Sequence, residues 1–210
     1  GGCIVDSGKF DWRASGKFPG LCTPDDSYHG VTYVDKFGIE GAYITKATAQ
    51  LMRDFGSTPA PQSAFLLNLG LESLHVRMER HCANAQAVAE FLEGHEKITW
   101  VNYAGLPSNR YHELAKKYFR FGASAVMTIE LEGTLESTVK FVESLRLSAH
   151  MTMIGDSITV VTHPASTTHK QLSDQAKEAA GITPTLLRIS LGLENVEDII
   201  ADYQQALEKI

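Results

Sequence analysis

The chain has 210 residues, of which 43% are hydrophobic and 21% are charged, and this near-average globular composition excludes wholesale disorder. Its 19 Lys and Arg residues against 25 Asp and Glu residues give a net charge of −6, which argues against nucleic acid as a partner. No apolar run approaches the roughly 18 residues of a membrane span, so we expect a soluble cytoplasmic protein without a membrane partner.

The first 61 residues change character twice along the chain. An apolar, strand-like run at Ile4 and Val5 opens the sequence, and because a strand needs neighbours we expect the chain to be part of a larger protein. Residues 9–41 are rich in Gly, Pro and Asp and predict a long functional loop. Helical character returns over Ala42–Phe55 and ends at Gly56.

A long apolar stripe follows the prolines at positions 59 and 61. Its spacing predicts one helix from Gln62 to about Glu93. Such a helix exceeds the usual length in a compact domain, so we interpret residues 62–95 as a connector between two domains.

Residues 96–210 alternate between strand and helix patterns. Strands are predicted at 98–101, 125–131, 157–162 and 186–193. The helices between and after them are predicted to begin at Ser108, Thr134, Thr168 and Asn195. The pattern predicts an α/β domain.

The last predicted strand carries the most informative charged residue. Alternation places Arg188, Ser190 and Gly192 on one face, opposite Leu187 and its apolar neighbours. Two small neighbours leave room for a planar anion, and a guanidinium binds carboxylates in a two-pronged fork. A solvated arginine on an open face is the alternative.

Two histidine clusters are weaker candidates for chemistry. His163-Pro164-Ala165-Ser166-Thr167-Thr168-His169 crowds imidazoles and hydroxyls together, but it lacks the acidic or thiol ligands of a metal site, and a capping box at Thr168 explains part of it. His75, His81 and Cys82 lie along the long helix without a third ligand, which favours a core cysteine and surface histidines. No metal site is predicted, and the three cysteines, at wide spacing, do not form a disulfide framework.

Several motifs together resemble the cysteine/methionine-metabolism family of pyridoxal-phosphate (PLP) enzymes, which have the aspartate-aminotransferase fold type. Within it the likeness is closest to the O-acetylhomoserine sulfhydrylases, and it covers essentially the whole chain. The motifs that carry it are Gly1-Gly2-Cys3-Ile4-Val5-Asp6-Ser7-Gly8, Ser27-Tyr28-His29-Gly30, Arg77-Met78-Glu79-Arg80-His81, Gly105-Leu106-Pro107-Ser108, the His163–His169 run and Leu187-Arg188-Ile189-Ser190-Leu191-Gly192.

The resemblance implies that the chain is the C-terminal half of such an enzyme. Residues 1–61 would be the tail of the large PLP-binding domain, 62–95 a connecting helix and 96–210 the small α/β domain. The cofactor lysine would precede Gly1, so Lys46 is expected to be a solvated helix lysine, and PLP would be bound mainly by the missing N-terminal half. Arg188 matches the arginine that holds the substrate α-carboxylate, while Met153 stands where relatives place an Asn or Ser that helps to position it.

The implied activity is γ-replacement on an activated homoserine ester with sulfide or a thiol, giving homocysteine or methionine, by a homo-oligomer, expected to be a tetramer. Methionine γ-lyase and cystathionine γ-synthase chemistry are alternatives within the family. A third alternative is that this chain is a non-catalytic fragment or subunit.

Overall fold

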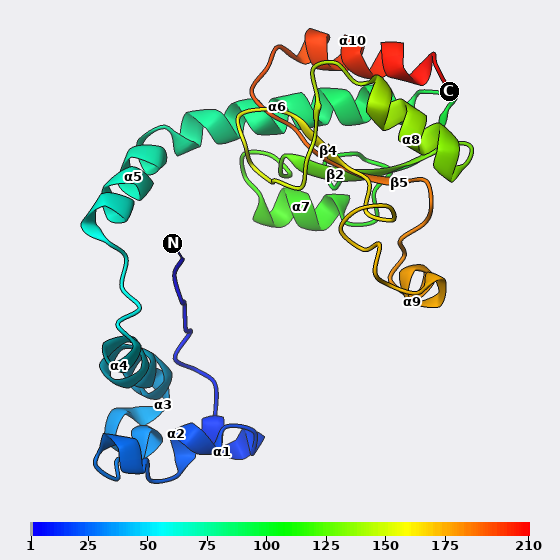
Figure 1. Cartoon of the computed structure of the whole chain (residues 1–210). Helices are drawn as coiled ribbons and strands as arrows, with labels where there is room; N and C mark the ends of the chain where they lie inside the picture. The colour runs from blue at the N-terminus through cyan, green and yellow to red at the C-terminus, as the bar shows by residue number, and fades with distance from the viewer. Residues whose placement is uncertain (1) are drawn as a thin grey trace. The chain divides into compact units, whose positions relative to one another are not determined.

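The computed structural model describes residues 2–210, and the chain divides into two compact units, Gly1–Glu72 and Ser73–Ile210 (Figure 1). Each unit has a hydrophobic core of its own. Among the described residues, no helix is both long enough and apolar enough to cross a membrane.

The first unit is helical. Its elements are α1 (Trp12–Ser15), α2 (Pro19–Cys22), the 3-10 turn η1 (Asp26–Tyr28), α3 (Tyr33–Thr45), the π-type helix η2 (Lys46–Met52), α4 (Arg53–Phe55) and α5 (Pro61–Glu72). The prediction of a continuous loop over 9–41 is therefore wrong. Asp11 caps α1 through the backbone N–H groups of Arg13 and Ala14, and the buried Trp12 donates from Nε1 to the carbonyl oxygen of Ile39 at 3.0 Å. These local bonds order the segment without a long period in the sequence.

The predicted helix over 42–55 is confirmed, but it begins earlier, at Tyr33. Gly38 interrupts α3 with φ 68°, a left-handed conformation that glycine adopts readily. The strand-like run at Ile4 and Val5 forms no strand, and both side chains are exposed. No neighbouring strand exists among the described residues of this unit to pair with it.

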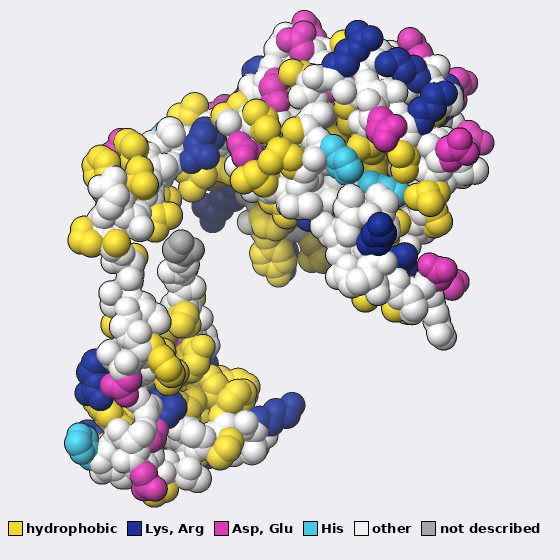
Figure 2. Space-filling model, viewed as in Figure 1, with side chains coloured by type: hydrophobic (Ala, Val, Ile, Leu, Met, Phe, Trp, Pro, Cys, Tyr) yellow, Lys and Arg dark blue, Asp and Glu magenta, His cyan; other side chains and the backbone are white. Residues whose placement is uncertain are grey.

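The predicted single helix over 62–93 is two helices. Ser73 has non-helical angles (φ −107°, ψ 2°) and separates α5 from α6 (Leu74–Glu93). Every large apolar side chain of α5 is exposed, and Figure 2 shows hydrophobic side chains gathered over this helix; they are Phe65, Leu66, Leu67, Leu69 and Leu71. A helix that is apolar on all sides is typical of a buried position.

The second unit contains one five-stranded sheet. Its strands are β1 (Ile98–Asn102), β2 (Val126–Leu131), β3 (Ala149–His150), β4 (Val160–Thr162) and β5 (Leu186–Ser190), in the order β1-β2-β5-β4-β3. All neighbours are antiparallel except β3 and β4, which are parallel. Four of these strands were predicted. The two-residue β3 was missed because so short a strand has no periodicity.

Helices cover the sheet. They are α6, α7 (His112–Tyr118), α8 (Leu135–Ser144), α9 (Asp174–Ala179) and α10 (Val196–Leu207), and Figure 1 shows α6, α8 and α10 together on one side. The face of β5 that carries Leu187 and Ile189 is fully buried against this side, together with Phe141 of α8 and Tyr203 of α10. The predicted division of faces along β5 is therefore confirmed.

Helix starts were predicted unevenly. Thr134 forms a capping box with Ser137, as its position predicts. The predicted capping box at Thr168 is wrong, because residues 164–172 form turns and bends and α9 is capped by Ser173 instead. The start at Ser108 is also wrong, since α7 begins at His112.

Candidate functional site

Arg188 lies near the middle of the sheet. It is the third residue of β5, and the register places it between Thr128 of β2 and Thr162 of β4. Its side chain is half-buried on the face opposite the main hydrophobic core. Neighbouring strands therefore fix the backbone of Arg188 on both sides.

The guanidinium is held by two bonds from one nitrogen. Nη2 donates to the carbonyl oxygen of Thr152 at 2.8 Å and to Oγ1 of Thr162 at 3.1 Å. Oγ1 of Thr162 in turn donates to the carbonyl oxygen of Met151. The segment 151–152 thus passes beside the arginine, and the threonine hydroxyl connects the two.

The other nitrogens of Arg188 are uncommitted. Nε is buried and has no hydrogen-bond partner among the described residues. A buried donor without an acceptor costs about 1–3 kcal/mol, so a carboxylate placed there would remove a penalty. This observation favours a ligand-binding role over a solvated arginine.

A two-pronged contact with a carboxylate has a structural consequence here. A guanidinium offers two forks, Nε with Nη2 and Nη1 with Nη2, and both include Nη2. Because Nη2 of Arg188 already uses both of its hydrogens, a bidentate carboxylate must displace either the Thr152 carbonyl or the Thr162 hydroxyl.

The room predicted beside Arg188 is smaller than the sequence suggests. Oγ of Ser190 accepts a hydrogen bond from the backbone N–H of Gly155 at 3.0 Å. A Cβ atom at Gly192 would lie 2.4 Å from the carbonyl carbon of Ile158, so backbone fills the space above that glycine. The prediction of open space over both small residues is therefore wrong at Gly192. Met153, next to Thr152 in the chain, is 48% exposed.

His163 is satisfied by protein groups. Its Nε2 donates to the carbonyl oxygen of Pro184 at 2.9 Å, which leaves Nδ1 to accept from Oγ of Ser166 at 2.8 Å. Burial lowers the pKa of His163 below its ordinary value of 6.5. The ring is a neutral structural group, and no three metal-binding side chains cluster anywhere in residues 2–210.

The histidines of α6 differ from one another. His81 is buried, and its Nδ1 donates to the carbonyl oxygen of Leu191 at 2.6 Å, so the expectation of a surface histidine is wrong there. Cys82 is buried, as expected, while His75 is exposed.

Lys46 is not the solvated lysine that was expected. Its ammonium pairs with Asp25, donates to Oε1 of Gln50 at 2.8 Å and lies 4.6 Å from the centre of the Tyr33 ring. The bonds from Lys46 and Ser27 lower the pKa of the Asp25 carboxyl. The position of this lysine depends on the fold of residues 25–33, which the local helical pattern did not reveal.

Comparison with known proteins gives the family. Residues 25–208 match the model of the family described as Cys/Met metabolism PLP-dependent enzymes. The chain belongs to this family. The predicted resemblance is therefore confirmed.

Similar proteins span the whole chain. A homocysteine synthase of Schizosaccharomyces pombe is 46% identical over 99% of the chain, and an O-acetyl-L-homoserine sulfhydrylase of Leptospira meyeri is 43% identical over 100%. These alignments cover 48% and 49% of the two relatives, so the chain spans about half of their length.

A crystal structure confirms the α/β fold class. The chain resembles a putative O-acetylhomoserine (thiol)-lyase from Campylobacter jejuni, with a TM-score of 0.79 and 41% identity, over 90% of this chain and 45% of that one. The crystallised protein carries a pyridoxyl-lysine phosphate.

Arg188 and Lys46 differ in the groups that they leave available to a ligand. Arg188 has a buried donor that lacks an acceptor, whereas the Lys46 amine is already engaged by Asp25 and Gln50. That Lys46 does not hold the cofactor covalently stays a prediction, which its contacts with Asp25 and Gln50 favour.

Proposed function

We propose that the enzyme containing this chain performs γ-replacement on O-acetylhomoserine, or a related activated homoserine ester, with sulfide or a small thiol. A bond forms between the γ-carbon and sulfur, the γ-carbon–oxygen bond breaks, and the carboxylate of the ester leaves. The product is homocysteine or methionine. The unpartnered Nε of Arg188 carries this proposal, because it supplies a binding group for an amino-acid carboxylate in a chain similar to sulfhydrylases.

The role of this chain is to bind and orient the substrate. Arg188 holds the α-carboxylate, and the carbonyl of Thr152 or the hydroxyl of Thr162 yields its bond to Nη2 as the carboxylate enters. Met153 lies beside this position and offers a thioether, which accepts hydrogen bonds weakly and donates none. The PLP cofactor, held mainly by the N-terminal half, supplies an electron sink for carbanions formed during the reaction.

The same proposal extends to organisation. Residues 1–61 belong to the large cofactor-binding domain, residues 62–95 connect the domains, and residues 96–210 form the small domain. The partners are the ester, sulfide or thiol, and the remaining half of the protein. The assembly is a cytoplasmic homotetramer. The exposed apolar side chains of α5 support burial of this helix in the complete protein.

An activity assay of the complete enzyme separates the alternatives. We expect homocysteine and acetate from O-acetylhomoserine plus sulfide. Thiol release from methionine without an acceptor would indicate a γ-lyase instead, and cystathionine from an activated homoserine ester plus cysteine would indicate a γ-synthase. If none of these products forms in the PLP-loaded enzyme, the proposal is wrong.

A labelling experiment tests the part assigned to Lys46. The 210-residue chain is mixed with PLP, reduced with borohydride and digested for mass spectrometry. We expect no stoichiometric label on Lys46, because Asp25 and Gln50 occupy its ammonium. Stoichiometric and selective labelling of Lys46 would contradict the assignment of the cofactor lysine to another part of the enzyme.

A further inference from the structure

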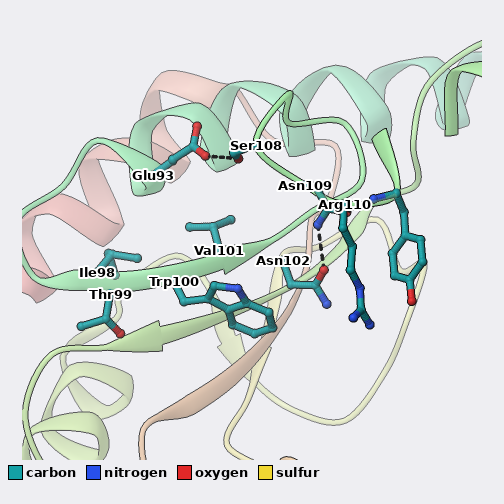
Figure 3. A pocket seen from close by; sticks show the side chains of 10 residues that line it. Glu93, Ile98, Thr99, Trp100, Val101, Asn102, Ser108, Asn109 and Arg110 are labelled. Carbon is teal, nitrogen blue, oxygen red and sulfur yellow. Dashed lines mark hydrogen bonds between the residues drawn. The ribbon is translucent and has the colours of Figure 1, made fainter. Parts of the chain in front are cut away.

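A groove runs along β1, away from the residues assigned to the substrate. It has a volume of about 570 Å³ and is shown in Figure 3. All five residues of β1 line it, together with Glu93 at the end of α6 and residues 108–111, which follow β1 in the chain.

The set of lining residues places the groove at the edge of the sheet. Successive side chains of a strand point to opposite faces, so five consecutive residues can line one groove only where it follows the strand edge. Strand order agrees, because β1 ends the sheet and pairs only with β2. An edge strand presents backbone N–H and C=O groups that can pair with another extended chain.

Side chains distinguish the two sides of this edge. A register irregularity between Ile98 and Trp100 turns Thr99 and Trp100 to the same side, and Figure 3 shows Asn102 there as well. Trp100 is 47% exposed, so a flat apolar surface lies open beside the backbone. Ile98 and Val101 point to the other side and are partly buried.

The two charged residues that line the groove differ in their partners. The carboxylate of Glu93 accepts a hydrogen bond from the hydroxyl of Ser108. At the Asn102 end, the Arg110 guanidinium lies 4.6 Å from the centre of the Tyr111 ring and has no ion-pair or hydrogen-bond partner among the described residues. The acid already has a donor, whereas the arginine still lacks an anion.

We propose that this groove binds an extended segment of another protein as an additional strand beside β1, with an Asp or Glu of that segment paired to Arg110. The bound segment is extended because it pairs with the backbone of β1. The exposed face of the Trp100 ring contacts an apolar side chain of the segment, and Arg110 pairs with its acidic residue. Glu93 and residues 108–111 line the other side of the groove. In a second copy of the chain, β1 would carry its own Glu93 and residues 108–111 beside it. A single extended strand therefore fits the groove better than the β1 edge of a second copy.

Fluorescently labelled peptides test the proposal by anisotropy on the 210-residue chain. The probes are TVTVE, TVTVK, and TVTVE with alternate backbone nitrogens methylated, all acetylated and amidated. We expect weak binding of TVTVE, with a Kd on the order of 0.1–1 mM, as is reasonable for so short a segment. The methylated peptide should not bind, because it cannot pair with a strand edge.

Charge exchange at Arg110 tests the orientation. In Arg110→Glu, binding of TVTVE should fall by about fivefold, the upper end for loss of an exposed ion pair, and TVTVK should become the preferred peptide. Arg120→Glu is the matched control, since it makes the same charge change at an exposed arginine outside the groove and should leave the preference unchanged.

Three outcomes would overturn the proposal. Equal binding of the methylated peptide would exclude strand pairing. If Arg110→Glu and Arg120→Glu changed the peptide preference equally, the effect would come from the net charge of the chain and not from a contact with Arg110. Failure of TVTVE to bind, together with a dimer in sedimentation that Trp100→Glu dissociates, would assign the groove to a second copy of the chain.

Discussion

Replacing Arg188 with Lys in the complete enzyme tests the substrate assignment most directly. Lysine keeps the positive charge, but it loses the planar fork and the Nε donor that the structure leaves unpartnered. We therefore expect impaired binding of the amino-acid carboxylate despite the retained charge.

The size of the effect follows from the bonds available. Charge-assisted hydrogen bonds contribute about 1.5–3 kcal/mol each to stability or binding. Arg188 gains at least one such bond, at Nε, and a second through Nη2 replaces an existing bond to Thr152 or Thr162. The net loss should therefore correspond to about one bond, or roughly a 10- to 100-fold reduction in kcat/KM.

Steady-state kinetics with O-acetylhomoserine and sulfide measure this loss. The reduction should appear mainly in KM for the ester, with the PLP absorbance unchanged, because the cofactor is assigned to the other half. Thr162→Val provides an internal comparison. It frees one hydrogen of Nη2 and should therefore impair the ester KM much less than Arg188→Lys.

The result that refutes the reasoning is specific. If Arg188→Lys and Arg188→Ala both keep kcat/KM for the ester within twofold, while thermal unfolding shows intact folds, Arg188 does not hold the substrate. A fall in the Tm of both variants that accounts for the lost activity would also refute the reasoning, since it would assign Arg188 to the architecture of the sheet.

Three further predictions concern stability, measured by thermal or denaturant unfolding of the chain. Lys46→Met should destabilise the chain at pH 7. Because the folded pKa of Asp25 is lowered, the difference in free energy of unfolding from the wild type should shrink as the pH falls below about 4. A difference that does not change with pH would contradict the ion pair. The folded pKa of His163 is lowered, so its contribution is complete above pH 6.5 and declines below it; His163→Gln should flatten this decline, and an unchanged pH profile would count against the neutral ring. Gly192→Ala should cost about 1–3 kcal/mol, because its Cβ would meet the backbone at Ile158; a neutral substitution would show that the space is open.

The sequence predicted those features that depend on the alternation of side chains within a single strand. Alternation along β5 correctly separated Arg188 from Leu187 and Ile189, because each side chain's face depends only on its neighbours in the strand. The contacts of the guanidinium were beyond this reasoning. They depend on the register of β4 and on the path of residues 151–155, which contain no repeating pattern.

The first unit shows a different limit. Its short helices are defined by single caps and by distant partners, such as Asp11 at the start of α1 and the bond from Trp12 to Ile39 across 27 residues. A search for helical periods finds little in four-residue helices. The role of Lys46 was missed for the same reason, because its partner Asp25 lies 21 residues earlier in the chain.

Lys46 and Arg188 differ in whether the fold supplies partners for their charged groups. The ammonium of Lys46 already has an anion, an amide oxygen and an aromatic ring, so its charge is used to hold the first unit together. Arg188 is fixed through Nη2 alone, and its buried Nε bears a desolvation cost that nothing in the described residues offsets. A cation satisfied by the fold stabilises it, whereas a positioned donor without an acceptor favours a ligand that brings one. The ligand that we propose is an amino acid, whose carboxylate would supply that acceptor.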